Sequence, residues 1–279
     1  MAENLIQMEH IHKYFPGVHA LNDVHLSVKA GEVHALIGEN GAGKSTLMKV
    51  LNGIYKKDGG RILYKGKEVE LDGPETAQAL GIGMIHQELN LMPHLTVAQN
   101  IFIGREPMRL GLFIDAAKAN AEAQKLLDSL NIRIDATALV SSLSVAKQQL
   151  VEIAKALSYD SELLVMDEPT AALTESEIVE LFKFIRQLKA KGHGIIYISH
   201  RLEELWEISD RVTVMRDGQY VDTVNTADVT KEDIINMMVG RVIYEDPKQK
   251  SNVSPDAPVV LEACLLYTSP SPRDTERSR

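Results

Sequence analysis

The sequence has a single cysteine and no long apolar run, and each shortage excludes a class of protein. Cys264 is the only cysteine among 279 residues, so an internal disulfide framework is excluded. No apolar stretch approaches the roughly 18 residues that a membrane-spanning helix needs. The most hydrophobic segments, such as GIIYIS, are short enough to be buried strands instead.

The chain also lacks an excess of basic residues and a secretory leader. Its formal net charge is −9, which disfavours a surface for polyanions such as nucleic acid. The first ten residues, MAENLIQMEH, have no basic segment followed by an apolar one, so no signal peptide is expected. These absences together predict a protein of the cytoplasm.

The remaining composition is that of an ordinary globular protein, with 44% hydrophobic and 25% charged residues. Short buried strands alternate along the chain with amphipathic segments, for example a helix predicted over residues 175–191 that Gly192 closes. From about residue 90 to residue 157 the pattern is mostly helical. The sequence therefore predicts an α/β fold interrupted by a helical insertion.

A glycine-rich segment supplies the strongest chemical signal. GENGAGKST follows an apolar strand, precedes a helical pattern and matches G-x-x-x-x-G-K-[ST]. Such glycines let backbone N–H groups approach phosphate oxygens, the lysine reaches the β- and γ-phosphates, and the serine hydroxyl coordinates Mg²⁺. The alternative, a glycine-rich turn with a surface lysine, fits this strand–loop–helix context less well. The predicted nucleotide-binding residues are Gly38, Glu39, Asn40, Gly41, Ala42, Gly43, Lys44, Ser45 and Thr46.

Two carboxylates follow a second buried strand, in the segment LLVMDEP. The carboxyl ends of such strands are where α/β proteins form their sites. Asp167 is suited to the outer coordination sphere of Mg²⁺, and Glu168 to polarising an attacking water. An acidic surface turn is the alternative interpretation.

Four further polar or aromatic residues carry weaker signals when each is taken alone. Gln87 and His200 each follow an apolar strand, where such residues are usually structural. Tyr14 and Phe15 could stack on a base, although an aromatic ring near a strand end usually just packs. Ser144, in LSVAKQQ, is either a plain helix N-cap or part of a nucleotide-sensing segment.

The order of these elements along residues 3–243 resembles that of the ABC-type ATPases. The resemblance implies a P-loop NTPase with a RecA-like core, an antiparallel β-subdomain and an inserted α-helical subdomain at about residues 90–157. It also implies that two such domains form a head-to-tail dimer around two ATP molecules. Phe15 or Tyr14 would then stack on adenine, Gln87 would contact Mg²⁺, Glu168 would be the catalytic base, and Lys44 and His200 would contact the γ-phosphate.

LSVAKQQ occupies the position where this family commonly has Leu-Ser-Gly-Gly-Gln. The resemblance implies that Ser144 serves the ATP of the opposing half, while Val145 and Ala146 replace glycines that allow close backbone approach to phosphate. AALT lies where the family has a further cross-dimer segment, but Thr174 replaces its usual aspartate.

Longer segments, including HQELNLMPHLTVAQNIFIGREP and VEIAKALSYDSELLVMDEPTAALTESE, resemble the first ATPase half of monosaccharide importers of the ribose, galactose and xylose type. This resemblance implies ATP and Mg²⁺ as cofactors, and a peripheral location on the cytoplasmic face of the cell membrane. Its implied partners are transmembrane permease subunits, a sugar-binding protein, and a second ATPase half or a second copy of the chain. Nucleic acid is not an expected partner.

The composition changes after residue 241. Residues 244–258 are polar and contain prolines, which predicts a linker. VVLEA, residues 259–263, resembles the opening strand of a second ATPase half, and the serine-, proline- and arginine-rich residues 264–279 are interpreted as a foreign or disordered tail. The ATPase domain is therefore predicted over residues 1–243 of a truncated chain.

Two other functions remain open at this point. A soluble ABC-type ATPase that acts on ribosomes or DNA would be expected to carry a basic face, which the charge of −9 disfavours. A non-catalytic nucleotide-binding fragment would fit the truncation, although Lys44, Asp167 and Glu168 are all present.

Overall fold

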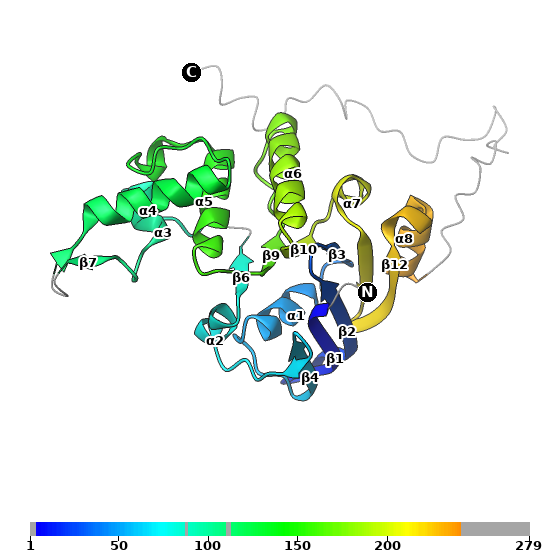
Figure 1. The fold of residues 1–279 in the computed structure, drawn as a ribbon. Helices are drawn as coiled ribbons and strands as arrows, with labels where there is room; N and C mark the ends of the chain where they lie inside the picture. The colour runs from blue at the N-terminus through cyan, green and yellow to red at the C-terminus, as the bar shows by residue number, and fades with distance from the viewer. Residues whose placement is uncertain (1–3, 87–88, 110–112, 241–279) are drawn as a thin grey trace, which may run out of the picture. The chain divides into compact units, whose positions relative to one another are not determined.

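The structure is a computed structural model that describes residues 4–86, 89–109 and 113–240 (Figure 1). The chain divides into two compact units, Met1–Arg241 and Val242–Arg279, and every described residue belongs to the first. The predicted linker at 244–258, the strand at 259–263 and the tail at 264–279 therefore lie outside the described residues, as does Gln87.

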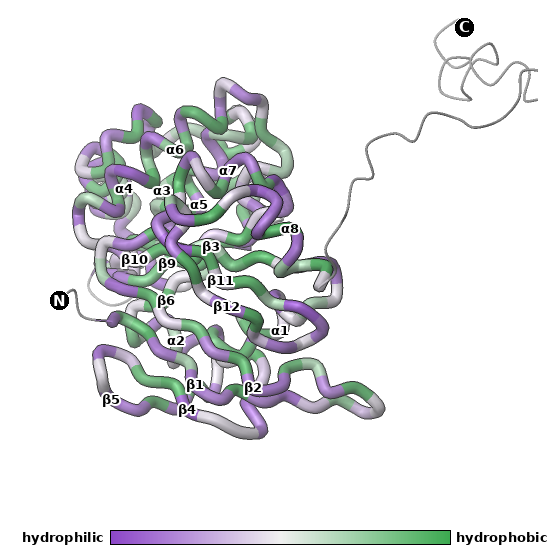
Figure 2. The backbone as a smooth tube through the Cα atoms, turned by 90° about the vertical axis from the view of Figure 1, so that its right-hand side faces the viewer, coloured by the Kyte–Doolittle hydropathy of each residue, from purple (hydrophilic) through white to green (hydrophobic). Residues whose placement is uncertain are grey.

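A mixed sheet organises this unit. Its strand order in the described residues is β5-β4-β1-β2-β12-β11-β3-β10-β9-β6, and Figure 2 shows these strands side by side. The strands are β1 (Asn4–Phe15), β2 (Val18–Lys29), β3 (Val33–Ile37), β4 (Gly59–Tyr64), β5 (Lys67–Glu68), β6 (Ile82–Ile85), β9 (Leu163–Asp167), β10 (Gly194–Ile198), β11 (Arg211–Arg216) and β12 (Gln219–Asn225).

Helices cover both faces of the parallel part of the sheet (Figure 1). They are α1 (Lys44–Leu51), α2 (Pro74–Ala79), α3 (Val97–Ile101), α4 (Ala116–Ser129), α5 (Val145–Leu157), α6 (Glu175–Ala190), α7 (Leu202–Ile208) and α8 (Lys231–Val239). No helix in the described segments is both long and apolar enough to cross a membrane.

The parallel strands are mostly apolar, as expected of strands that are buried on both faces. Along β9, Leu163 and Val165 belong to the core that contains α1, whereas Leu164 and Met166 belong to the core that contains α5 and α6. This alternation follows from the two-residue period of a strand. It confirms the prediction that short continuous apolar runs form the centre of an α/β fold.

At one end of the sheet, β1, β2, β4 and β5 pair antiparallel. The inner face of these strands supplies residues such as Ile6, Met8 and Leu26 to the same core as the buried face of α1. Helix α1 is therefore packed between the antiparallel strands and the parallel strands, and the glycine-rich loop before it is held from two sides.

The insertion between residues 90 and 157 contains α3, α4 and α5, as predicted, but it also contains a small hairpin. Strands β7 (Met108–Arg109) and β8 (Phe113–Ile114) pair antiparallel. Pro107 directly precedes this hairpin and has no N–H to extend a helical turn, which explains why the mostly helical pattern is interrupted there.

Candidate nucleotide-binding site

The glycine-rich loop connects the buried strand β3 to helix α1. Gly43 has φ +95°, a conformation that L side chains rarely adopt, and a Cβ there would lie 2.9 Å from the Ala20 carbonyl oxygen. A Cβ on Gly38 would lie 2.3 Å from the Met215 carbonyl oxygen. These two glycines are therefore required by the close approach of neighbouring backbone.

Helix α1 begins with its N–H groups directed at the loop. Its first turn contains no acidic residue, and Gly43 provides no side-chain cap. The first N–H groups of a helix have no partner within it, and the helix dipole places partial positive charge there. The loop and the start of α1 together form a site suited to phosphate.

Lys44 is buried, and its side chain is folded back across the loop. Its Nζ donates hydrogen bonds to the carbonyl oxygens of Gly38 at 2.7 Å and Glu39 at 3.1 Å. Burial lowers the pKa of the ammonium group, and the negative charges of Glu168 and Asp167 act in the opposite direction. The cation is thus held beside the position that the loop prepares for an anion.

The two predicted carboxylates follow one another at the end of β9. Burial raises the pKa of Asp167, and the adjacent charge of Glu168 raises it further. Glu168 has φ +48°, which is uncommon for a residue with a side chain, and its N–H donates to the Ile198 carbonyl oxygen at 2.9 Å. That bond ties Glu168 to the end of the neighbouring strand β10.

His200 lies two residues beyond β10, which pairs in parallel with β9. Its Nε2 is 2.6 Å from Oε1 of Glu168, so the two side chains form a close ion-pair contact. The parallel pairing explains this meeting, because adjacent parallel strands bring their carboxyl ends to one edge of the sheet.

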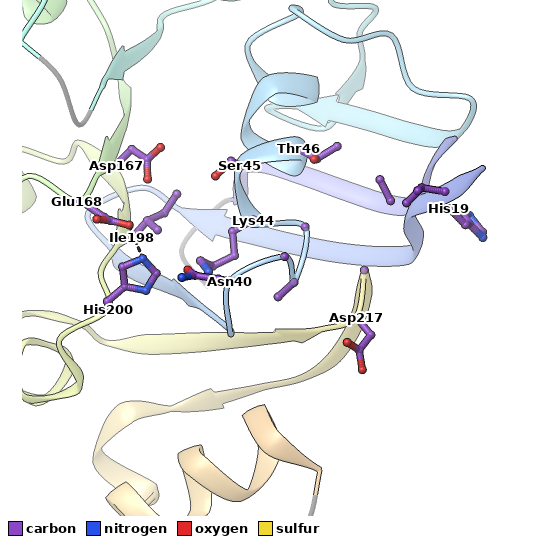
Figure 3. A pocket seen from close by; sticks show the side chains of 16 residues that line it. His19, Asn40, Lys44, Ser45, Thr46, Asp167, Glu168, Ile198, His200 and Asp217 are labelled. Atoms are coloured by element: carbon purple, nitrogen blue, oxygen red, sulfur yellow. Dashed lines mark ion pairs between the residues drawn. The ribbon is translucent and has the colours of Figure 1, made fainter. Parts of the chain in front are cut away.

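These segments line one pocket of about 530 Å³ (Figure 3). Figure 3 shows the Asp167 carboxylate and the Ser45 hydroxyl directed toward each other, with Glu168 and His200 beside them. The lining residues are Val18, His19, Ala20, Asn40, Gly41, Ala42, Gly43, Lys44, Ser45, Thr46, Asp167, Glu168, Ile198, His200, Asp217 and Gly218. The other two predicted loop residues, Gly38 and Glu39, line a neighbouring pocket with Asn40 and His200.

Two hairpins contribute pocket residues that the sequence patterns did not predict. His19 and Ala20 belong to the β1–β2 hairpin, and Asp217 and Gly218 form the turn between β11 and β12. The Gly218 N–H donates to the Ala42 carbonyl oxygen at 3.2 Å, so this turn supports the phosphate loop directly. The Asp-Gly turn itself is visible in the sequence, but its contact with a residue so distant in the chain is not.

The two aromatic candidates lie near this pocket without lining it in the described structure. Tyr14 is 54% exposed and stacks on the pocket residue His19, with ring centroids 4.0 Å apart. Phe15 packs edge-on against Tyr55, with centroids 5.2 Å apart. His19 is therefore the ring that the fold brings directly to the pocket.

Ser144 lies at the start of α5 and away from the pocket that Lys44 lines. It is the N-cap of the helix, and its hydroxyl oxygen accepts the Lys147 N–H at 3.4 Å. Val145 follows with 41% exposure, so its side chain is open to solvent. Thr174 likewise begins α6, where its N–H and hydroxyl both donate to the Glu177 carboxylate.

Helix α5 also holds the chain shortly after Gln87. Glu152 is buried on α5, and its carboxylate accepts the Asn90 N–H at 2.6 Å. One turn further along, Lys155 Nζ donates to the Asn90 carbonyl oxygen at 3.4 Å. Both backbone groups of Asn90 are thus bound by the helix that Ser144 caps.

The sequence matches the family model described as ABC transporter over residues 21–171, which is more than half of the chain. This chain belongs to the ABC transporter family. A solved ATP-binding cassette of an ABC transporter, MJ1267 in its ADP conformation, is 28% identical with a TM-score of 0.72, covering 85% of this chain and 99% of that one. CbiO1 from Clostridium perfringens, part of the ABC transporter complex cbiONQ, is 26% identical with a TM-score of 0.71, covering 86% and 97%. The predicted P-loop NTPase fold is confirmed.

Among curated ABC transporter proteins, two from Burkholderia are similar to this chain. One named as ribose/galactose/methyl galactoside import ATP-binding protein 3 of Burkholderia ambifaria is 60% identical over 238 residues, or 85% of this chain and 46% of the relative. The import ATP-binding protein 1 of the same series in Burkholderia lata is 60% identical over 274 residues, which is 98% of this chain and 53% of the relative. The chain spans about half the length of the curated relatives it matches.

Proposed function

We propose that the chain binds Mg·ATP in the pocket of Figure 3 and hydrolyses its γ-phosphate bond. The observation that carries this proposal is the convergence of three distant segments. The phosphate loop brings Lys44, the end of β9 brings Asp167 and Glu168, and the end of β10 brings His200 to one pocket. Phosphoryl transfer needs groups that neutralise phosphate charge and groups that align the attacking water, and these residues supply both.

The residues of the pocket fit a magnesium ion. The Ser45 hydroxyl and the Asp167 carboxylate are hard oxygen donors, and a site of one carboxylate, one hydroxyl and substrate phosphates is typical of Mg²⁺. When bound with nucleotide, Mg²⁺ neutralises charge on the β- and γ-phosphate oxygens. Gln87, outside the described residues, is a further proposed contact of the ion.

Lys44 and the loop bind the phosphates in this proposal. The ammonium leaves the carbonyl oxygens of Gly38 and Glu39 for phosphate oxygens, which are stronger acceptors because they are charged. The N–H groups from Gly41 to Thr46 bind the remaining phosphate oxygens. His19 or its stacking partner Tyr14, or Phe15 next to Tyr14, provides the ring for the base.

Glu168 accepts a proton from the attacking water, and His200 positions the carboxylate for this step. The 2.6 Å contact between them restricts the rotation of the glutamate side chain, and the N–H···O bond to Ile198 fixes its backbone. A carboxylate with one orientation aligns a water more effectively than one that samples several. His200 is also proposed to contact the γ-phosphate.

Ser144 is proposed to act on the nucleotide of another ATPase half. It begins α5 outside the pocket that Lys44 lines, and its hydroxyl and the free N–H groups of the helix start are available to an anion. The second half is either a further domain in a longer protein or a second copy of this chain.

We further propose that the ATPase energises import of a monosaccharide, on the cytoplasmic face of the cell membrane. The names of the Burkholderia relatives support this substrate class. Transmembrane permease subunits and, through them, a sugar-binding protein are the proposed partners. ATP hydrolysis by residues 1–243 would be the part of this activity that the chain supplies.

The experiment measures the affinity for Mg·ATP. The protein is titrated with Mg·ATP, and displacement of a fluorescent nucleotide analogue reports binding. Lys44→Ala is expected to weaken binding at least tenfold, because phosphate charge in a partly desolvated site loses its cation. Lys118→Ala, on the exposed face of α4, is the matched control and is expected to bind like the parent. Equal affinities for all three proteins would overturn the assignment of the phosphate loop.

A further inference from the structure

A second cluster of ionisable side chains lies on the outer face of the β1–β2 hairpin. Nδ1 of His10 is 2.7 Å from Oδ1 of Asp23, and Nε2 of His25 is 3.4 Å from the same oxygen. One ligand atom from each of the three residues lies within 4.8 Å of the others. None of them lines the pocket that contains Lys44.

A strand irregularity explains why the three side chains converge. Met8 pairs with Leu26 and Ile11 with Val24, so β1 uses one more residue than β2 across this interval. Such a bulge re-aims side chains that regular alternation would separate. His10 and Asp23 both have positive φ, at 52° and 57°, and histidine and aspartate are among the residues that tolerate this conformation.

The histidine rings are held by contacts of their own. The ring of His25 meets that of His10 nearly at right angles, with centroids 4.4 Å apart, and packs edge-on against Tyr220 at 5.6 Å. The His10 amide also makes a long 3.5 Å contact with Nδ1 of His25, which turns the other ring nitrogen, Nε2, toward Asp23. The cluster is therefore oriented before any ligand arrives.

We propose that His10, Asp23 and His25 form a binding site for a divalent transition-metal ion such as Zn²⁺. Tetrahedral zinc with bonds of about 2.0–2.1 Å separates its ligand atoms by about 3.3 Å. The 3.4 Å distance from His25 Nε2 to Asp23 Oδ1 matches that spacing, and the 2.7 Å distance from His10 Nδ1 to the same oxygen needs to open by about 0.6 Å. Water supplies the fourth ligand.

The chemistry of the three ligands agrees with this assignment. Two imidazoles and one carboxylate are a donor set that suits zinc and related ions rather than Mg²⁺ or Ca²⁺. Asp23 is exposed, and an exposed aspartate is ionised at neutral pH, as a metal ligand must be. Each neutral ring keeps its proton on the nitrogen that faces away from the ion.

That proton placement has two local consequences. Nδ1 of His10 exchanges its hydrogen bond with Asp23 for a bond to the ion, and a contact of His25 also changes. With the ion on Nε2, His25 carries its proton on Nδ1, so the long contact from the His10 amide is given up. His10 is an exposed residue, and water replaces the lost acceptor there. The bonds to the ion far exceed the value of a 3.5 Å contact.

A bound ion would fasten β1 to β2 below the hairpin tip that carries Tyr14 and His19. Its effect on the protein is stabilisation by mass action, because the ligand atoms are brought together only in the folded chain. The melting temperature is therefore expected to rise with the concentration of free Zn²⁺. This inference is independent of the proposed ATPase function.

The test is isothermal titration of the full chain with Zn²⁺ alone, in the absence of nucleotide. One site per chain is expected, and His25→Gln and Asp23→Asn are each expected to weaken it at least tenfold. Asparagine retains the shape and φ tolerance of Asp23, so a loss of binding there is not a loss of folding. Thermal melts without metal check that each variant is folded.

Three matched variants separate this site from its rivals. His12 and His19 form a neighbouring imidazole pair with ring nitrogens 3.4 Å apart, so His12→Gln is the first control. Glu168→Gln tests the nucleotide pocket, and Cys264→Ser tests the thiol. All three are expected to bind Zn²⁺ like the parent. Undiminished binding by His25→Gln, or loss confined to any of these controls, would overturn the proposal.

Discussion

Nε2 of His200 lies 2.6 Å from Oε1 of Glu168, although the two residues follow different strands. The pair joins the carboxyl ends of β9 and β10 at the wall of the nucleotide pocket. Glu168 is only partly exposed, its backbone N–H is bonded to Ile198, and the contact with His200 restricts its side chain further. The proposed catalytic base and the residue proposed to orient it are therefore expected to act as a unit.

Replacing Glu168 by glutamine is expected to preserve Mg·ATP binding and slow hydrolysis by about 10²–10⁴, the usual contribution of a positioned base. The amide has the same shape but does not accept the proton of the water. Steady-state phosphate release and nucleotide titration measure the two effects separately. Glu180→Gln, an exposed residue of α6, is the control, and turnover at the parent rate by Glu168→Gln would assign the base elsewhere.

The coupling between the pair is tested by His200→Ala alone and together with Glu168→Gln. His200→Ala is expected to slow hydrolysis, and the double variant to be no slower than Glu168→Gln, because residues that act as a unit are non-additive. The measurement is a double-mutant cycle on the hydrolysis rate. Fully multiplicative losses would mean that His200 works independently of Glu168.

Gly43→Ala is expected to cost more stability than Gly192→Ala, although both glycines have φ near +95°. The left-handed backbone alone costs about 1–2 kcal/mol for alanine. At Gly43 the new Cβ would also lie 2.9 Å from the Ala20 carbonyl oxygen, whereas nothing lies within 4 Å at Gly192. Urea unfolding measures the difference in the free energy of unfolding between the two variants. Nucleotide titration is expected to show weaker binding only for Gly43→Ala. Equal stabilities would remove the steric argument for that glycine.

Glu32 provides a pH-dependent part of the folding free energy. Burial opposes ionisation of its carboxyl group, but hydrogen bonds from His34 and Arg211 outweigh burial and lower the pKa to about 2. Because the folded pKa lies below the ordinary 4.5, the stabilisation is complete above that pH and is lost as pH falls toward 2.

Glu32→Gln is therefore expected to destabilise the protein by about 3 kcal/mol at pH 7, as removal of one partner leaves the Arg211 charge unpaired. Urea unfolding at several pH values measures the gap between parent and variant. The gap is expected to narrow between about pH 4.5 and pH 2. A gap that does not change with pH would mean that Glu32 acts through packing.

The signature segment is tested by comparing Ser144→Ala with Val145→Gly/Ala146→Gly. Ser144→Ala is expected to cost about 1 kcal/mol of stability as a lost N-cap and also to lower the ATPase rate. The glycine pair is expected to raise that rate if closer backbone approach outweighs a helix cost of about 1 kcal/mol per glycine. The rate is measured against protein concentration, because the site needs a second half. An ATPase rate per chain that changes neither with protein concentration nor with Ser144→Ala would mean that the segment is only a helix cap.

Local patterns predicted the parallel core and the phosphate loop because each depends on neighbouring residues. The apolar run before Asp167 and the one before His200 each determine a buried strand, and parallel pairing then brings their ends together. The pocket wall formed by His19 and Gly218 was not predictable in this way. It depends on contacts across the sheet between turns that carry ordinary hairpin sequences.

The two hydrogen bonds between helix α5 and Asn90 connect this helix to the segment that follows β6. The carboxylate of Glu152 holds the Asn90 N–H and Lys155 holds its carbonyl oxygen, so rotation of α5 carries the segment after β6 with it. A displacement of α5 at Ser144 is therefore expected to move Asn90 as well. Slow hydrogen exchange of the Asn90 amide, accelerated in Glu152→Ala but not in Lys147→Ala, is the signature of such a rigid linkage.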